Sequence, residues 1–122
     1  MSYGKELILD LHECDVSTFN RKNIEEYLKK LCEIIDMERQ DLHFWDYTGV
    51  PEEELPTEAH LLGTSAVQFI STSDIVIHTL DILKKVFLNI FSCKDFDVDV
   101  ASSFSEEYFK GKIVTKYVIE RQ

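Results

Sequence analysis

The hydrophobic pattern of this chain changes period several times, and these changes limit the fold more than any other feature of the sequence. Two segments follow helical spacing: Ile24–Ile35, with Asn20 as its cap, and Val100–Tyr108, ending near Gly111. Short alternating or apolar runs predict strands at Lys5–His12, Leu42–Tyr47, Ser65–Ser71, Ile75–Leu80, Val86–Cys93 and Ile113–Ile119. Runs of strands interrupted by only two helices indicate an α+β fold, a two-layer α/β sandwich with a mostly antiparallel sheet and both helices on one face.

Size and charge argue against several classes of protein. The chain has 122 residues, 44% of them hydrophobic, which suffices for one domain over residues 1–122 with a single core. A formal net charge of −10 argues against nucleic-acid binding and favours cationic ligands over anionic ones. The start, MSYGKELILDL, has no long apolar run, so we expect neither a signal peptide nor a membrane span. Cys14, Cys32 and Cys93 are odd in number and form no CxxC motif, so we expect free thiols in a reducing cytoplasm.

The stretch ISTSDIVIHT, residues 70–79, places hydroxyls, an acid and a histidine among residues typical of a buried strand. Strand alternation fixes the face on which His78 lies, and Cys93 ends the next predicted strand, within cross-strand reach of that face. We therefore expect Ser73, His78 and Cys93 to surround one cavity, with Ser65 close to the Thr72–Ser73 bond. His78 or Cys93 on the opposite face from Ser73 would contradict a catalytic site. Taken singly, each is more often structural.

Other motifs for chemistry are missing from the sequence. No phosphate-binding glycine loop, HExxH or GxSxG motif is present. The four histidines are dispersed, so the sequence gives no support for a metal site.

The longest predicted connection is Thr48–Gly63, which contains both prolines, four glutamates and His60. Long loops in small domains are often functional or mobile. Two interpretations of this loop stay open: a solvated acidic loop without a role, and a lid or a contact with a partner.

Three blocks, GKELILDLHECD, SAVQFISTSDIVIHT and VFLNIFSCKDFD, resemble the small prokaryotic S-adenosylmethionine decarboxylase family in order and spacing over nearly the whole chain. The resemblance implies an α/β sandwich, a homodimer and a proenzyme that cuts its own backbone. In this family a serine hydroxyl attacks the preceding carbonyl and turns the amide into an ester. Elimination and hydrolysis then release the N-terminal fragment and leave a pyruvoyl group at the new N-terminus.

Carried onto this sequence, the resemblance assigns roles to the predicted cluster. The cleavage serine is Ser73, so the bond to be cut is Thr72–Ser73, and an unusual turn there would promote the acyl shift by strain. Ser65 corresponds to the serine that assists processing. His78 corresponds to the histidine that supports ester formation and elimination.

The same resemblance makes Cys93 the general acid of decarboxylation. It would protonate the substrate α-carbon after carbon dioxide leaves, while the pyruvoyl carbonyl derived from Ser73 binds the substrate amine and draws off electrons. This role requires a protonated thiol, which apolar neighbours such as Phe91 would favour.

Departures from the family pattern affect substrate recognition most. The usual Glu-Ser-His at the cleavage point is Thr72-Ser73-Asp74 here, and His-Thr-Trp-Pro-Glu becomes His78-Thr79-Leu80-Asp81-Ile82. Leu80 replaces one of two rings that sandwich the adenine, which would cost on the order of 1 kcal/mol or more. Tyr47 is the candidate for the other ring. Asp81 is one residue early for the family's glutamate and shorter.

Three functions stay open at this point. The first is a self-processing pyruvoyl decarboxylase of S-adenosylmethionine in spermidine synthesis. The second keeps the chemistry but acts on a smaller cationic amino acid such as arginine or ornithine, bound by Asp81 or Glu52–Glu54. The third is an uncut, non-enzymatic paralogue that binds or regulates a true decarboxylase.

Overall fold

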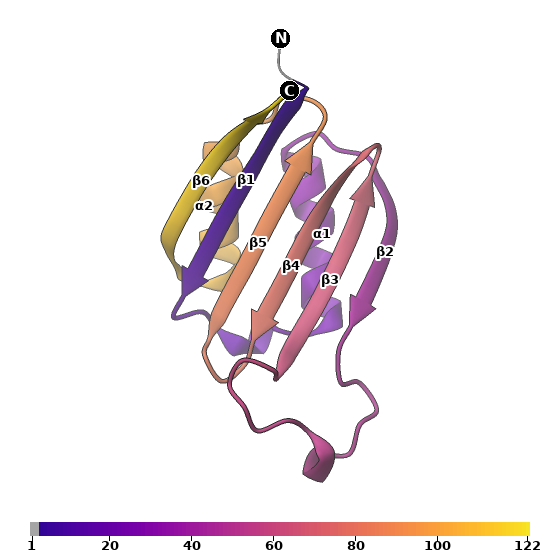
Figure 1. Ribbon diagram of the computed structural model, residues 1–122, viewed down its shortest axis with the longest axis vertical. Coiled ribbons are helices and arrows are strands. Elements are labelled where there is room, and N and C mark those ends of the chain that lie inside the picture. Colours follow the sequence, from indigo (N-terminus) through magenta and orange to yellow (C-terminus); the bar gives the residue numbers. More distant parts are fainter. Residues whose placement is uncertain (1–2) are drawn as a thin grey trace.

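The computed structural model describes residues 3–122, which form a sheet of six strands and two long helices. Both helices lie on the same side of the sheet (Figure 1). The α+β prediction of a two-layer sandwich is therefore confirmed. The strands and helices are β1 (Gly4–His12), α1 (Arg21–Ile34), β2 (Arg39–Trp45), β3 (Gly63–Ile70), β4 (Ser73–Leu80), β5 (Lys85–Ser92), α2 (Val98–Phe109) and β6 (Lys112–Arg121). Single helical turns, η1 (Val16–Thr18) and η2 (Glu52–Glu54), lie in the connections.

The strands follow the order β2-β3-β4-β5-β1-β6, and every neighbouring pair is antiparallel. β2 to β5 follow one another as neighbours, whereas β1 inserts between β5 and the last strand, β6. The two central strands of the sheet are therefore β4 and β5. None of the helices formed by residues 3–122 is long and apolar enough to cross a membrane.

Strand alternation divides the sheet into two unlike faces. On the face covered by the helices, buried apolar side chains of β1, β4 and β5 pack against both helices around Tyr27 and Phe109. The opposite face carries no helix (Figure 1), and we call it the open face. Its side chains are the alternate residues of the same strands, polar and apolar together.

The helix ends follow from local chemistry. The side chain of Asn20 accepts a hydrogen bond from the N–H of Asn23 and caps α1, as its sequence predicts. The residue that ends α2 in a left-handed conformation is Lys110, with φ of 51°, rather than Gly111. Gly111 is needed for a different reason, because a Cβ there would lie 2.4 Å from the Cys14 sulfur.

The two ends of the β3–β4 hairpin differ. At one end a turn of only Ser71 and Thr72 joins the strands, so β4 begins at Ser73, two residues earlier than predicted. At the other end the long connection between β2 and β3 extends beyond the sheet (Figure 1). β5 ends at Ser92, and Cys93 therefore lies just outside the strand that was predicted to contain it.

Candidate active site

The turn before Ser73 holds Thr72 in the left-handed region, with φ of 50°. A β-branched residue rarely adopts this conformation, and such backbone outliers cost on the order of 1–3 kcal/mol. Two-residue hairpin turns favour positive φ, which Gly or Asn usually supplies. The sequence-based expectation of an unusual turn at the Thr72–Ser73 bond is thus met by a specific backbone angle.

Ser73 lies at the start of β4, with its side chain on the helix-covered face and only 7% of the residue exposed. Its Oγ accepts a hydrogen bond of 2.8 Å from the N–H of Cys93. The Cys93 thiol in turn donates to the carbonyl oxygen of Ser71 at 3.6 Å. These residues line a cavity of about 330 Å³ together with Met37 and Ile70. The structure therefore brings Ser73 and Cys93 together as predicted.

The electrostatic surroundings of Cys93 differ from the prediction. The hydroxyls of Thr72 and Ser73 lower the pKa of the Cys93 thiol below its ordinary value. The expected apolar neighbour, Phe91, lines the cavity on the open face instead. The expectation that Phe91 keeps the thiol protonated is therefore wrong for the uncut chain, because the thiol lies among hydroxyls.

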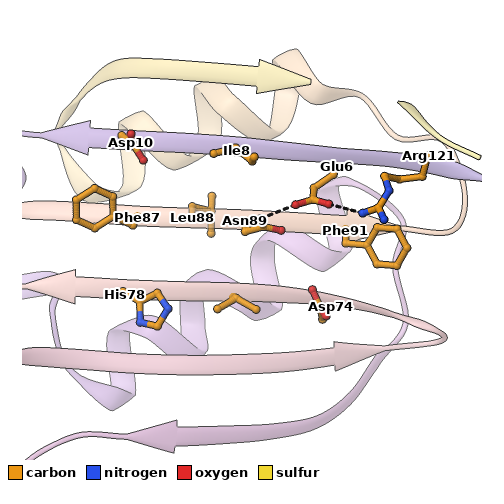
Figure 2. Close-up of a pocket in the computed structure, with 11 residues that line it drawn as sticks. Glu6, Ile8, Asp10, Asp74, His78, Phe87, Leu88, Asn89, Phe91 and Arg121 are labelled. Carbon is orange, nitrogen blue, oxygen red and sulfur yellow. Dashed lines mark hydrogen bonds and ion pairs between the residues drawn. The ribbon is translucent and has the colours of Figure 1, made fainter. Parts of the chain in front are cut away.

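Ser65 and His78 form a second pair on the open face. Cross-strand register places them opposite each other on β3 and β4, and Ser65 Oγ lies 2.7 Å from His78 Nδ1. The imidazole faces a cavity of about 560 Å³ that continues over β5 and β1. Figure 2 shows His78 and Asp74 on the same strand beside this cavity, with Glu6 and Asn89 across from them.

The prediction that Ser73, His78 and Cys93 surround one cavity, with Ser65 close to the Thr72–Ser73 bond, is wrong. Ser73 and His78 are five positions apart on β4, an odd number, so alternation directs their side chains to opposite faces. Five positions along a strand also separate them by about 17 Å. Ser65 is equally far from the Thr72–Ser73 bond. Within one chain, the structure gives two separate pairs, Ser73 with Cys93 and Ser65 with His78, which we call half-sites. By the criterion stated above, this contradicts a catalytic site formed by one chain alone.

Asp74 lies next to the cleavage point in sequence, where its charge would oppose the oxyanion formed during attack. Its side chain lines the open-face cavity and so points away from Ser73 Oγ (Figure 2). Burial, and then the charge of Glu6, raise the pKa of the Asp74 carboxyl. Both the direction of the side chain and this pKa shift reduce its effect on the Thr72 carbonyl.

The predicted substrate-binding residues lie at the far end of β4 from Ser73. Tyr47 and Asp81 line one cavity of about 290 Å³, and Leu80 is the last residue of the strand. One oxygen of Asp81, Oδ1, is buried and has no hydrogen-bond partner among residues 3–122. Burial raises the pKa of this carboxyl. A donor group entering the cavity would satisfy that oxygen.

The acidic connection Thr48–Gly63 forms part of the wall of this cavity. Val50, Leu55 and Leu62 line it, together with the first residues of α1. Arg21 and Asp46 line the same cavity, and Arg21 donates two hydrogen bonds to the Asp46 carboxylate, of 2.6 and 2.8 Å. The connection therefore covers a cavity, although its three glutamates at Glu52–Glu54 are exposed.

Sequence reasoning missed Trp45, which ends β2 directly opposite Ser65. Its side chain is 65% exposed, and its ring lies 5.3 Å from that of Tyr47. An exposed tryptophan beside the Ser65–His78 pair offers the stacking surface that Leu80 lacks. It is the single tryptophan of the chain, which is a weak signal that the sequence did contain.

Comparisons with known proteins agree with this fold. The model of the S-adenosylmethionine decarboxylase family matches residues 5–122. Among solved structures, the adenosylmethionine decarboxylase from Aquifex aeolicus VF5 superposes with a TM-score of 0.76 at 18% identity, covering 98% of this chain and 91% of that one. No curated protein matches the sequence. Because the family model covers nearly the whole chain, the protein belongs to the S-adenosylmethionine decarboxylase family.

Proposed function

We propose that this protein is a self-processing, pyruvoyl-dependent decarboxylase of S-adenosylmethionine that cuts its own chain between Thr72 and Ser73. The observation that carries the proposal is the strained, left-handed Thr72 directly before a buried serine whose Oγ is held by the Cys93 N–H. Strain at the attacked peptide is released when the bond is cut, which lowers the barrier to cleavage.

Cleavage begins when Ser73 Oγ attacks the Thr72 carbonyl carbon. The C–N bond to Ser73 breaks, its nitrogen takes up the hydroxyl proton, and the amide becomes an ester. The hydrogen bond from the Cys93 N–H fixes Ser73 Oγ in place. The hydroxyl proton of Ser73 stays free to be removed. Elimination of the Thr72 carboxylate needs a base that takes the Ser73 α-proton, and His78 is the candidate for that base. Water then hydrolyses the resulting dehydroalanine, which loses its nitrogen as ammonia and becomes the pyruvoyl group.

The residues around Ser73 fit the pyruvoyl group that processing would leave there. Cys93 borders the same cavity, and Met37 and Ile70 supply apolar parts of its wall. The group, once formed, supplies the electron sink for decarboxylation. Cys93 then holds a proton at Sγ for the substrate α-carbon, within the cavity that contains residue 73.

The two half-sites are joined in a homodimer in this proposal. Ser65 and His78 lie on the open face, which has no covering layer, whereas Ser73 and Cys93 lie at the end of the same sheet. A second copy packed on the open face in the reverse direction brings its Ser65–His78 pair to the turn end of the first copy. There the pair reaches the Thr72–Ser73 peptide past the end of the sheet, because Ser73 Oγ itself lies on the helix-covered side. Each dimer then contains two complete sites.

The proposal places the protein in the cytoplasm, acting on a small cationic substrate in the synthesis of spermidine and other polyamines. Trp45, and beside it Tyr47, supply aromatic surface near the Ser65–His78 pair for the adenine. Stacking on such rings contributes about 1–3 kcal/mol per base.

A second candidate function is decarboxylation of a smaller cationic amino acid. It is favoured by Asp81, whose buried oxygen has no partner among residues 3–122, and by Leu80 in place of a stacking ring. Carbon dioxide release from S-adenosylmethionine, arginine, ornithine and lysine distinguishes the two. We expect S-adenosylmethionine to be preferred, with Trp45→Ala raising its KM about fivefold or more. A preference for arginine or ornithine would select the second candidate.

Denaturing mass spectrometry of the purified chain after prolonged incubation tests the proposal itself. We expect two fragments, one ending at Thr72 and one beginning with a pyruvoyl group at position 73 that reacts with hydrazine. Ser73→Ala, which keeps the fold but removes the nucleophile, should stay at full length. An intact wild-type mass after days, with no reactive carbonyl, would leave only the non-enzymatic paralogue.

A further inference from the structure

The last strand, β6, is an open edge of the sheet. It pairs only with β1, it has ten residues, and it lies at the outer side of the sheet in Figure 1. Its apolar side chains are exposed on both faces, with Tyr117, Val118 and Ile119 exposed to 63%, 44% and 45%. Both edges have an irregularity, which is a common protection of edge strands. β2 shifts register between Arg39 and Leu42, and β6 shifts between Ile113 and Thr115, so only the part of β6 from Thr115 on pairs with β1 without interruption.

The outward backbone groups of β6 follow from the register of the sheet. In antiparallel strands the N–H and C=O of successive residues point alternately to the two sides. The two-residue turn makes Ile70 and Ser73 a hydrogen-bonded pair. The paired residues can be followed strand by strand from β4 through β5 and β1 to β6. This alternation then directs the N–H and C=O groups of Tyr117 and Ile119 toward β1.

A second observation agrees with this orientation. The carbonyl of Arg121, which belongs to the same alternate set, accepts a hydrogen bond of 2.7 Å from the N–H of Tyr3. The backbone groups of the other set, Lys116, Val118 and Glu120, therefore point away from the sheet. They form a row of donors and acceptors that another strand can pair with.

We propose that this edge pairs with β6 of a second copy, antiparallel and with Val118 opposite Val118 across a two-fold axis. In this register Lys116 lies opposite Glu120 of the second copy, and the symmetry repeats that pair. Tyr117 then lies opposite Ile119, an aromatic and a β-branched residue that pack well across strands. One register thus matches both the charges and three of the four exposed apolar side chains of β6, all except Val114.

Neighbouring registers match less well. A shift that centres the axis on Tyr117 leaves Lys116 opposite Val118, and a further shift places Lys116 opposite Lys116 of the second copy. Like charges directly opposite one another are destabilising. The proposed axis is perpendicular to the sheet, so the open faces of both copies stay free. Edge pairing is therefore separate from the packing of open faces and independent of cleavage at Thr72–Ser73.

Disulfide trapping tests the register in the full chain with the exposed Cys93 replaced by serine. Val118→Cys should form a covalent dimer under mild oxidation, because hydrogen-bonded pairs have Cα atoms about 5.5 Å apart, within disulfide range. Val114→Cys is the matched control: Val114 has a similar exposure of 48%, but the two copies of residue 114 lie far apart in this register. Equal trapping at both positions, or none at Val118→Cys, would overturn the proposal.

A charge exchange tests the same pairing without cysteines. Because Lys116 also pairs with Asp99 at 2.6 Å, the single change is made at Glu120. Glu120→Lys creates two like-charge pairs and should weaken this association about tenfold, measured by light scattering over a concentration series. In an Asp99→Asn background, which removes the intrachain pair with Lys116, the double change Lys116→Glu with Glu120→Lys should restore it. Equal assembly in all three proteins would contradict the proposed register.

Discussion

Thr72 combines two properties that oppose each other at the level of a single residue. Its branched Cβ crowds the carbonyl that Ser73 must attack, yet its positive φ stores strain that cleavage releases. The sequence shows the branching directly, whereas the backbone angle depends on the length of the turn between β3 and β4. This is why the strain could be expected but not located from the sequence.

Replacing Thr72 by glycine should stabilise the uncut chain and slow its cleavage. Glycine adopts positive φ without strain, so in a Ser73→Ala background the free energy of unfolding should rise by about 1 kcal/mol. Urea denaturation measures this change. Thr72→Ala keeps a Cβ and should gain less. Both variants lose the branched Cβ, so with Ser73 present, faster cleavage in Thr72→Gly than in Thr72→Ala would show that strain does not drive the reaction.

The thiol of Cys93 should react before the other two thiols of the chain. The Thr72 and Ser73 hydroxyls lower the pKa of Cys93, whereas burial raises the pKa of Cys14 and Cys32 to about 11. Iodoacetamide labelling followed over pH by peptide mass spectrometry should therefore show Cys93 reacting at the lowest pH. Ser73→Ala removes one hydroxyl, so the labelling profile of Cys93 should shift to higher pH. An unchanged profile would mean that Ser73 does not contact the sulfur.

At the level of elements, local periodicity was sufficient to predict the two helices and the six strands. This is because both helices and the four inner strands bury one face, and the edge strands β2 and β6 still alternate in sequence. Strand ends were less predictable, since Cys93 continues the alternation of β5 in sequence but lies beyond its end at Ser92. Contacts between distant elements were not predictable at all. The pair of Arg21 and Asp46 joins the start of α1 to the end of β2, and no local pattern connects them.

The Arg21–Asp46 pair should make stability depend on pH in the acid range. Hydrogen bonds from Arg21, opposed by partial burial, lower the pKa of Asp46 to about 2, below its usual value of 3.8. A depressed carboxyl pKa stabilises the fold above about pH 4, and this contribution is lost as pH falls toward 2.

Asp46→Asn should therefore reduce the free energy of unfolding by about 1 kcal/mol at pH 7 and have little effect near pH 2. Chemical denaturation at both pH values measures the difference. Asp36→Asn, which removes an exposed ion pair with Lys94, is the control and should change stability less at pH 7. An equal loss at both pH values would show that Asp46 acts through packing and not through its charge.

At the level of the whole molecule, the faces of the sheet decide how the site can work. The sequence contains all four residues that the family resemblance assigns to chemistry, and strand alternation already separates Ser73 from His78. The prediction of one cluster did not take into account the odd spacing between Ser73 and His78. A second copy removes the contradiction, because the face without helices is the one that carries Ser65 and His78. The homodimer is thus required by the proposed mechanism.

Mixing two inactive variants tests this central claim most directly. Ser73→Ala lacks the nucleophile, and His78→Ala lacks the imidazole of the second half-site. The two chains are refolded together, and denaturing mass spectrometry follows the cut between Thr72 and residue 73. Each variant alone should stay uncut or be processed slowly, whereas in the mixture the His78→Ala chain should be cut, because its Ser73 meets the His78 of the Ser73→Ala chain. A mixture no more cleaved than its separate components, under conditions where the wild-type chain cleaves, would contradict a site built from two copies.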